Sequence, residues 1–233
     1  MLNDYRGKMK SDWETRRDIV AYAKQVYDKG MVAATDGNVS YRLMTDRIMI
    51  TPSGTSFATL TTDTLAYVDL DGNILNFEYK PSSELPMHLE IYKQRPDINA
   101  IIHAHPPFAT ALTLTGHSLT DPILPEVVMM FGKIPTAPYA TPATQESANS
   151  IRHLIKDHDA ILLDHHGAVT YSASLQDAFH KMEKLEHAAK TILAAKSIGM
   201  PKTLDEIQLS RIKELGHNSD YGKMILNALF ADN

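Results

Sequence analysis

The sequence contains no cysteine, which excludes disulfide bonds, thiolate metal ligands and thiol catalysis. It has a single tryptophan, and no apolar run approaches the roughly 18 residues that a membrane-spanning helix needs. The start of the chain, from Met1 to Arg6, lacks the apolar segment of a secretory signal. We therefore expect a cytoplasmic protein that has no membrane partner and whose chemistry depends on oxygen and nitrogen groups.

An excess of positive charge is also missing. Lys and Arg total 23 against 28 Asp and Glu, for a net charge of -5 at pH 7. This balance lacks the electrostatic footprint of a nucleic-acid-binding protein, so any anionic ligand must be held by a local pocket. With 233 residues, of which 43% are hydrophobic, the chain can bury one large core. We expect a single domain over residues 1–233.

Local patterns predict both helices and strands. A capping box, Ser11 to Glu14, opens a first helix that Gly30 ends. The apolar positions of this helix that are expected to face the core are Trp13, Val20, Ala23 and Tyr27. Helical periodicity predicts further helices over 83–95, 145–156 and 174–198.

Short β-type runs predict two antiparallel hairpins, 39–43 with 47–51 and 66–70 with 73–75. Asp71-Gly72, between the last two runs, favours a type I′ turn. Strands and helices without strict βαβ alternation favour a three-layer or an α+β arrangement around a mostly antiparallel sheet. The tail, 217–233, has little periodicity and is a candidate for packing on a neighbouring subunit.

Two histidines, His103 and His105, lie one residue apart at the end of an apolar run that begins at Ala100. Side chains at i and i+2 of a strand leave the same face, so both imidazoles would point to one place. A second apolar run, 160–163, ends in His165 and His166, beyond a strand end where open α/β sheets keep their sites. Consecutive residues point to opposite sides, so either His165 or His166, but not both, can join the pair.

Glu84 adds a carboxylate to these imidazoles. Three neutral imidazoles with a displaceable fourth ligand form a typical catalytic site for a divalent metal. The alternative is a pair of hydrogen-bonded histidines on a half-exposed strand, because His-x-His is a short motif. The remaining histidines, His88 among them, are assigned to the core or the surface.

Small hydroxyl, amide and glycine groups gather in three further clusters: Thr35-Asp36-Gly37-Asn38, Ser53-Gly54 and Ser82-Ser83. Backbone N–H groups in glycine turns and at helix starts bind phosphate without net positive charge. Ordinary turn and cap chemistry explains each cluster taken alone. Their joint presence beside a candidate metal site favours phosphate binding modestly.

Several motifs follow one another along the chain: Gly37-Asn38-Val39-Ser40, Thr51-Pro52-Ser53-Gly54, Lys80-Pro81-Ser82-Ser83-Glu84, His103-Ala104-His105 and His165-His166-Gly167. In their residues and their order they resemble the class II aldolase/adducin family, in particular its fuculose-phosphate aldolases. The similarity runs from about Asp12 to Ile198. It implies an α/β/α fold and a ring-shaped homotetramer with active sites at subunit interfaces.

The resemblance also implies roles for individual residues. His103, His105 and His166 would bind Zn²⁺, with Mn²⁺ or Co²⁺ as other divalent options. Glu84 would be the fourth ligand, and would become the acid/base when substrate displaces it. The positions that would bind the substrate phosphate are Thr35, Gly37, Asn38, Ser53, Gly54, Ser82 and Ser83.

Two departures from the family pattern affect these roles. The motif before the third histidine is commonly Asn-His-Gly, and here His165 replaces the asparagine. Fuculose-phosphate aldolases carry a tyrosine acid between the two histidine motifs, and the matching stretch, Pro122 to Val127, offers Glu126 instead. The expected catalytic residues are therefore Glu84 and Glu126, the latter from the same or a neighbouring subunit. The family's ribulose-phosphate epimerases resemble Ser-Ser-Asp where this chain has Ser82-Ser83-Glu84, which argues against that branch.

The expected function is a metal-dependent aldolase that cleaves a ketose 1-phosphate to dihydroxyacetone phosphate and an aldehyde. L-fuculose 1-phosphate and a 5-deoxypentulose 1-phosphate are the candidate substrates. A sugar-phosphate dehydratase and a 3-oxo-acid-phosphate decarboxylase are the alternatives on the same scaffold, since all share metal-stabilised enolate chemistry. A non-catalytic, adducin-type interaction module is a remote alternative, because it has no use for the metal ligands.

Overall fold

The computed structural model describes residues 11–44, 46–76 and 78–217, and its strands form one sheet. The strands are β1 (Asn38–Met44), β2 (Arg47–Ile50), β3 (Ala66–Asp69), β4 (Ala100–Ala104), β5 (Thr136–Ala137), β6 (Ala160–Leu163) and β7 (Gly167–Ser172). Their order in the seven-stranded sheet is β3-β2-β1-β4-β7-β6-β5. All neighbours pair antiparallel except β5 and β6, which are parallel. The prediction of a mostly antiparallel sheet is confirmed.

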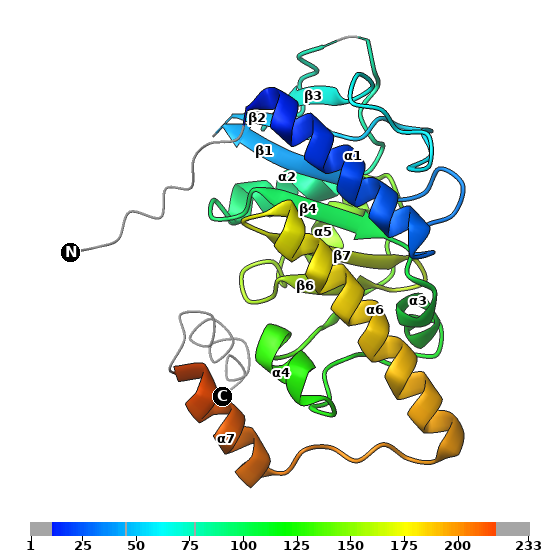
Figure 1. Cartoon of the computed structure of the whole chain (residues 1–233), viewed down its shortest axis with the longest axis vertical. Helices are drawn as coiled ribbons and strands as arrows, with labels where there is room; N and C mark the ends of the chain where they lie inside the picture. Colours follow the sequence, from blue (N-terminus) through cyan, green and yellow to red (C-terminus); the bar gives the residue numbers. More distant parts are fainter. Residues whose placement is uncertain (1–10, 45, 77, 218–233) are drawn as a thin grey trace, which may run out of the picture.

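Helices cover both faces of this sheet. They are α1 (Asp12–Asp28), α2 (Leu85–Gln94), α3 (Pro107–Thr113), α4 (Pro125–Phe131), α5 (Gln145–Ile151), α6 (Leu175–Ile198) and α7 (Glu206–His217). In Figure 1, α1 and α6 lie in front of the sheet, whereas α2 and α5 lie behind it. The predicted three-layer α/β/α arrangement is confirmed.

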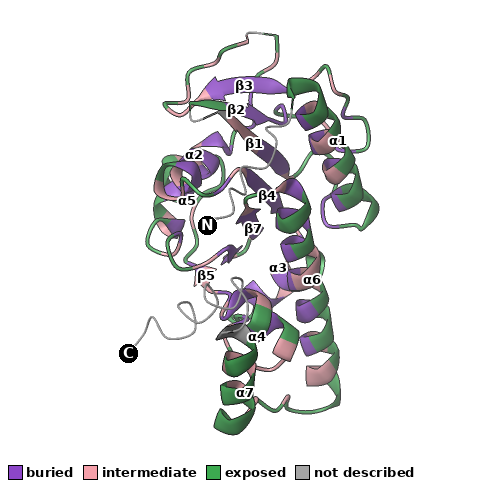
Figure 2. Cartoon of the chain, turned by 60° about the vertical axis from the view of Figure 1, so that its left-hand side comes forward, coloured by how far each residue is buried: buried purple, intermediate pink, exposed green. Residues whose placement is uncertain are grey.

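The core has two parts, one on each face of the sheet. Ile102 of β4 packs in the cluster that contains Ile19 of α1 and Leu185 of α6. Its neighbour Ile101 packs in the other cluster, with Met87 of α2. Because alternate strand residues point to opposite faces, a continuous apolar strand is what a sheet covered on both sides requires. Figure 2 shows this burial in the strands and in the inward faces of α1 and α6.

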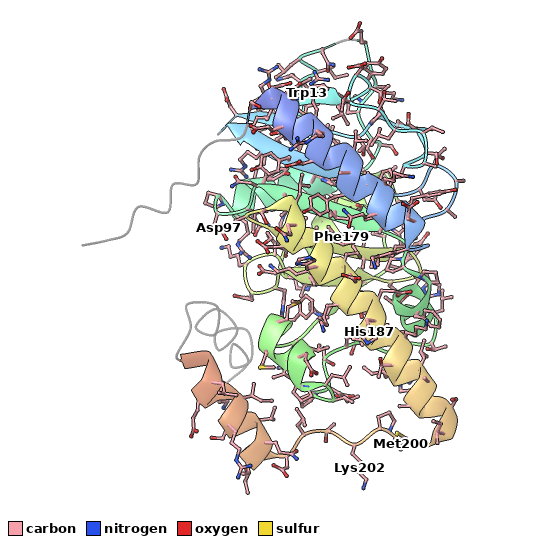
Figure 3. The ribbon with its side chains drawn as sticks, in the orientation of Figure 1. Trp13, Asp97, Phe179, His187, Met200 and Lys202 are labelled. Atoms are coloured by element: carbon pink, nitrogen blue, oxygen red, sulfur yellow. The ribbon has the colours of Figure 1, made fainter. Side chains whose placement is uncertain are left out.

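The first helix begins as the sequence predicts, but it buries a different face. The side chain of Ser11 accepts a hydrogen bond from Glu14 N, and the Glu14 carboxylate accepts one from Ser11 N, which completes the capping box. Trp13, at the start of α1 in Figure 3, is 60% exposed, and Tyr27 is 37% exposed. The residues that α1 buries are Thr15, Ile19, Ala23 and Val26. The assignment of Trp13 and Tyr27 to the core was therefore wrong.

Three further predictions need correction. Residues 73–75 do not form a strand; Ile74 makes an isolated bridge with Val68, and β3 pairs with β2 instead. Gly72 has a φ of +87°, but Asp71 does not have a positive φ, so the turn is not the type I′ turn that the dipeptide favours. The helix that begins at Gln145 ends at Ile151 rather than at residue 156.

The carboxyl-terminal helix α7 is mostly exposed and extends away from the sheet in Figure 1. None of the helices that the structure describes combines the length and the apolar character needed to cross a bilayer. Residues 218–233, which make up most of the predicted subunit-contacting tail, lie outside the described residues.

Candidate active site

Strand pairing gathers the candidate residues at one end of the sheet. The central strand β4 runs antiparallel to both β1 and β7, so its last residues lie beside their first ones. Asn38, at the start of β1, is paired with His103. His166 precedes β7 directly, and Glu84 is the N-cap of α2. Segments that are remote in the sequence therefore meet at this end.

Glu84, His103, His105 and His166 form a compact cluster. Each offers one ligand atom, and these four atoms lie within 4.8 Å of one another. Nε2 of His103 lies 3.1 Å from Nε2 of His105 and 2.9 Å from Oε2 of Glu84. Imidazole nitrogens bind zinc at about 2.0–2.1 Å, so two of them on one tetrahedral ion lie about 3.3 Å apart. The observed spacing fits ligands that share one small ion.

Hydrogen bonds on the outer side of two rings orient the inner nitrogens. Nδ1 of His103 lies 3.0 Å from the carbonyl oxygen of Ala168, which can only accept, so Nδ1 carries the proton. Nδ1 of His105 faces the carboxylate of Asp36 at 3.5 Å. Histidines that bind metals almost always donate their second N–H to such acceptors. Both rings are thus set to present an unprotonated Nε2 to the cluster.

The two oxygens of Glu84 differ in their surroundings. Oε2 accepts a hydrogen bond from Nδ2 of Asn38 at 2.9 Å. Oε1 is buried without a hydrogen-bond partner among the described residues, and it lies 3.4 Å from Nε2 of His166. A buried charged oxygen without a partner is costly unless a cation neutralises it. The donor set of three imidazoles and one carboxylate therefore fits a divalent metal ion.

The pKa shifts of Glu84, His105 and His166 agree with this fit, whereas at His103 the Glu84 carboxylate outweighs burial and raises the pKa. Burial alone would raise the pKa of Glu84, but His103, His166 and the Asn38 hydrogen bond outweigh it and hold the pKa well below its ordinary range. Burial, and to a smaller extent the neighbouring His103, lower the pKa of His105 and of His166 to about 4. Near pH 7 the carboxylate is therefore ionised and these two imidazoles are neutral. Metal ions bind these forms.

Of the two adjacent histidines, the structure brings His166 into the cluster and leaves His165 outside it. His165 has a φ of +58°, and its Nδ1 lies 2.8 Å from the carboxylate of Asp164 on the surface. This left-handed residue reverses the chain between β6 and β7. Gly167 follows because a Cβ there would approach the carbonyl oxygen of Ala104 to 2.3 Å.

The three predicted phosphate-binding segments are neighbours. Thr51 exchanges hydrogen bonds with Val39, and its carbonyl oxygen accepts from Ser82 N at 3.1 Å. Pro52 and Pro81 form an isolated bridge, which places the two serine loops side by side. Among the predicted phosphate-binding positions, the exposed ones are Thr35, Ser53, Gly54 and Ser83. These loops lie next to the cluster because Asn38, in the first segment, donates a hydrogen bond to Glu84, which directly follows Ser82 and Ser83 in the sequence.

Gly37, Asn38 and Ser82 are less exposed, and each contacts a residue of the metal-ligand cluster. A Cβ at Gly37, whose φ is +79°, would meet a side chain at 2.6 Å and the carbonyl oxygen of His103 at 3.0 Å. Asn38 bonds to Glu84 through its nitrogen, and its Oδ1 lies 2.5 Å from Nε2 of His88. Oγ of Ser82 accepts from Glu84 N at 3.3 Å. These residues shape the site, and their binding of phosphate stays a prediction.

Glu126 is exposed in the first turn of α4 and is not a member of the cluster. Its role as a second acid/base stays a prediction.

The sequence analysis gave Asp36, Ser40 and His88 no individual role at the site. His88 follows Glu84 by four residues, a spacing that places both on one side of a helix. Ser40 follows Asn38 by two residues in a strand, which places both on one face. These two spacings were the available signals.

Comparisons with known proteins agree with the geometry. A family model described as Class II Aldolase and Adducin N-terminal domain matches residues 17–193. A 5-deoxy-D-ribulose 1-phosphate aldolase of Bacillus thuringiensis serovar kurstaki is 34% identical over 199 residues, which cover 84% of this chain and 92% of that protein. A 3-oxo-tetronate 4-phosphate decarboxylase of Haemophilus influenzae is 33% identical over 184 residues, which cover 77% and 87%.

Among solved structures, an L-fuculose 1-phosphate aldolase matches with a TM-score of 0.81 and 31% identity, over 90% of this chain and 99% of that one. The sequence match, the shared fold and the cluster at the sheet end lead to one assignment. The chain belongs to the class II aldolase/adducin family.

Proposed function

We propose that this protein is a zinc-dependent aldolase that cleaves a ketose 1-phosphate to dihydroxyacetone phosphate and an aldehyde. The observation that carries the proposal is the cluster of Glu84, His103, His105 and His166 beside three loops suited to phosphate. Relatives named as aldolases of 5-deoxyribulose 1-phosphate and fuculose phosphate support this substrate class. A 5-deoxypentulose 1-phosphate and L-fuculose 1-phosphate are the substrates to test first.

A divalent ion held by these four residues would supply Lewis acidity to the carbonyl and hydroxyl oxygens of the substrate. In the direction of condensation, Glu84 removes a proton from C3 of dihydroxyacetone phosphate. Glu126 then protonates the aldehyde oxygen as the carbon–carbon bond forms. Cleavage runs the same proton transfers in reverse.

Glu84 is placed for this transfer by the unequal surroundings of its oxygens. Asn38 holds Oε2, so Oε1, which lies 3.4 Å from Nε2 of His166 without a hydrogen bond, is the oxygen that takes and returns the proton. Thr35, Ser53 and Ser83 are exposed, so their hydroxyl groups are available to bind the substrate phosphate.

The proposal extends to the whole assembly. The chain acts as a single domain in the cytoplasm and forms a homotetramer, in which Glu126 reaches the site of the same or a neighbouring subunit.

Release of dihydroxyacetone phosphate from a panel of ketose 1-phosphates, followed by a coupled assay, tests the function. We expect metal-dependent release from at least one member of the panel. A metal-loaded protein that cleaves none of them would contradict the proposal.

A decarboxylase is the second candidate, because a 3-oxo-tetronate 4-phosphate decarboxylase is 33% identical to this chain. Both reactions break a carbon–carbon bond and leave an enolate, so the cluster serves either one. Carbon dioxide release from 3-oxo-tetronate 4-phosphate, without dihydroxyacetone phosphate release from any ketose, would favour this candidate.

A further inference from the structure

A series of buried polar side chains, joined by hydrogen bonds and called the file below, runs from Glu84 into the interior between β1 and α2. Starting from the far end, Tyr92 OH lies 2.8 Å from Oγ of Ser40, which lies 2.6 Å from Nδ1 of His88. Nε2 of His88 lies 2.5 Å from Oδ1 of Asn38, and Nδ2 of Asn38 lies 2.9 Å from Oε2 of Glu84. His88 and Ser40 are completely buried. The whole file is buried, since Tyr92 and Asn38 are at most 2% exposed and Glu84 is 8% exposed.

The placement of the file follows from two regular spacings. Asn38 and Ser40 are alternate residues of β1 and share a face. His88 and Tyr92 lie one helical turn apart on α2. The strand residues and the helix residues therefore interleave along one line that ends at Glu84.

Donors and acceptors have one consistent direction along this line. Oδ1 of Asn38 can only accept, so Nε2 of His88 donates. Nδ1 of a neutral ring then accepts, so the hydroxyl of Ser40 donates to it and accepts from Tyr92. Tyr92 OH also lies 3.3 Å from the carbonyl oxygen of Asn99, a longer contact than the one to Ser40. Each donor in the file points toward Glu84.

The histidine in this file is neutral. Burial, with the nearby charge of His103, lowers the pKa of His88 to about 3. A neutral ring whose Nδ1 accepts from Ser40 keeps its single proton on Nε2.

We propose that His88 is a positioning residue that fixes the amide of Asn38 and, through it, the carboxylate of Glu84. An asparagine side chain can present either its oxygen or its nitrogen to a neighbour. The proton on Nε2 of His88 holds Oδ1 of Asn38, so Nδ2 faces Glu84 and keeps Oε1 turned toward His166. Without His88, Oδ1 of Asn38 loses its donor, and only the contact with the Glu84 carboxylate is left to orient the amide.

Packing alone does not require this polar file. The residues of α2 around it, Met87, Leu89 and Ile91, are buried by apolar contacts. Well-packed apolar groups often replace buried polar ones without loss of stability. The file is therefore better explained by the orientation that it imposes on Glu84.

The test compares His88→Gln, which retains an amide donor, with His88→Met, which does not. Met87→Leu, a buried neighbour outside the file, is the control for altered packing. We measure deuterium exchange at C3 of dihydroxyacetone phosphate in the metal-loaded proteins. His88→Met should lower kcat by about 10–100-fold with little change in KM, as for other groups that orient metal ligands. His88→Gln should recover most of kcat, and Met87→Leu should stay near the parent.

A second measurement does not depend on activity. Nitrogen-15 NMR of the metal-free parent should show His88 as the neutral ring protonated at Nε2, and the Asn38 side-chain resonances should shift in His88→Met but not in Met87→Leu. A proton on Nδ1, or Asn38 resonances unchanged in His88→Met, would overturn the proposal. Equal kcat in His88→Met and the parent would overturn it as well.

This inference rests on the proposed function for the role of Glu84. If the parent protein neither cleaves ketose phosphates nor exchanges the C3 proton, the proposed function fails. The NMR result then still decides whether His88 orients Asn38, so the two failures are distinguishable.

Discussion

Nε2 of His103 and Nε2 of His105 face each other at 3.1 Å, and each ring turns its other nitrogen toward an oxygen on the far side. Two lone pairs at this distance repel unless a proton or a metal ion lies between them. The ionised carboxylate of Glu84 beside them favours a cation. This relationship underlies the metal predictions.

Replacing His166 by Ala should remove the bound metal and the activity while the fold survives, because one of the three imidazole ligands is lost. His165→Ala is the matched control, since this neighbour lies outside the cluster with an exposed side chain. Metal content by mass spectrometry and circular dichroism of both variants provide the measurement. Metal loss from His165→Ala with retention in His166→Ala would show that the cluster uses the other histidine.

The parts of the fold that the sequence predicted depend on local signals. The capping box at Ser11, the apolar strands and the long periodic helix α6 are each set by neighbouring residues. The buried face of α1 was not predictable in this way, because Trp13 and Ile19 are both apolar and tertiary packing selects between them. The early end of α5 at Ile151 likewise follows from its surroundings rather than from periodicity.

At the site, too, local spacing was predictable from the sequence, whereas features set by tertiary structure were not. The spacing of His103 and His105 predicts their common direction, because a strand alternates. The choice of His166 over His165 depends on the left-handed backbone at His165, which sequence alternation does not reveal. The place of His88 depends on which face of α2 meets β1, a tertiary property.

Glu84→Gln and Glu126→Gln should separate the two proton transfers. Glutamine keeps most of the shape of Glu84 but cannot accept the proton, so kcat should fall by about 10²–10⁴-fold with metal retained. Glu126→Gln should slow bond cleavage while deuterium exchange at C3 of dihydroxyacetone phosphate continues. Exchange followed by NMR measures both. Exchange lost in Glu126→Gln but preserved in Glu84→Gln would reverse the two roles.

Ser83→Ala should mainly raise KM for a phosphorylated ketose. The exposed hydroxyl of Ser83 lies on the loop beside Ser53 and is free of the contact that ties Ser82 to Glu84. Losing a hydrogen bond to a charged oxygen costs about 1.5–3 kcal/mol, which corresponds to about 10–150-fold in KM. An unphosphorylated sugar is the control, and its turnover should not change. Equal turnover of both sugars by the parent would contradict phosphate recognition.

Asp159→Asn should lower the free energy of unfolding by about 3–5 kcal/mol, because it leaves a buried ammonium without its carboxylate. Nζ of Lys181, which is 3% exposed, lies 2.8 Å from Asp159. Lys181→Met should cost less, since Arg95 still pairs with Asp159 at 3.0 Å. Urea denaturation measures both changes. Metal content should not change, because this pair lies at the opposite end of the sheet; an equal cost in both variants would contradict the explanation.

The neutral state of His88 predicts how stability depends on pH. Burial, and then the charge of His103, lower the pKa of His88 to about 3 from an ordinary 6.5, so between these values the unfolded chain binds a proton that the folded chain does not. The contribution is therefore fully present above about pH 6.5 and is lost as the pH falls toward 3. His105 and His166 shift in the same direction, but they are present in the parent and in His88→Gln and largely cancel in the comparison. Urea denaturation of the two metal-free proteins should thus show a parent whose free energy of unfolding falls more steeply with decreasing pH; parallel curves would mean that the pKa of His88 does not change on folding.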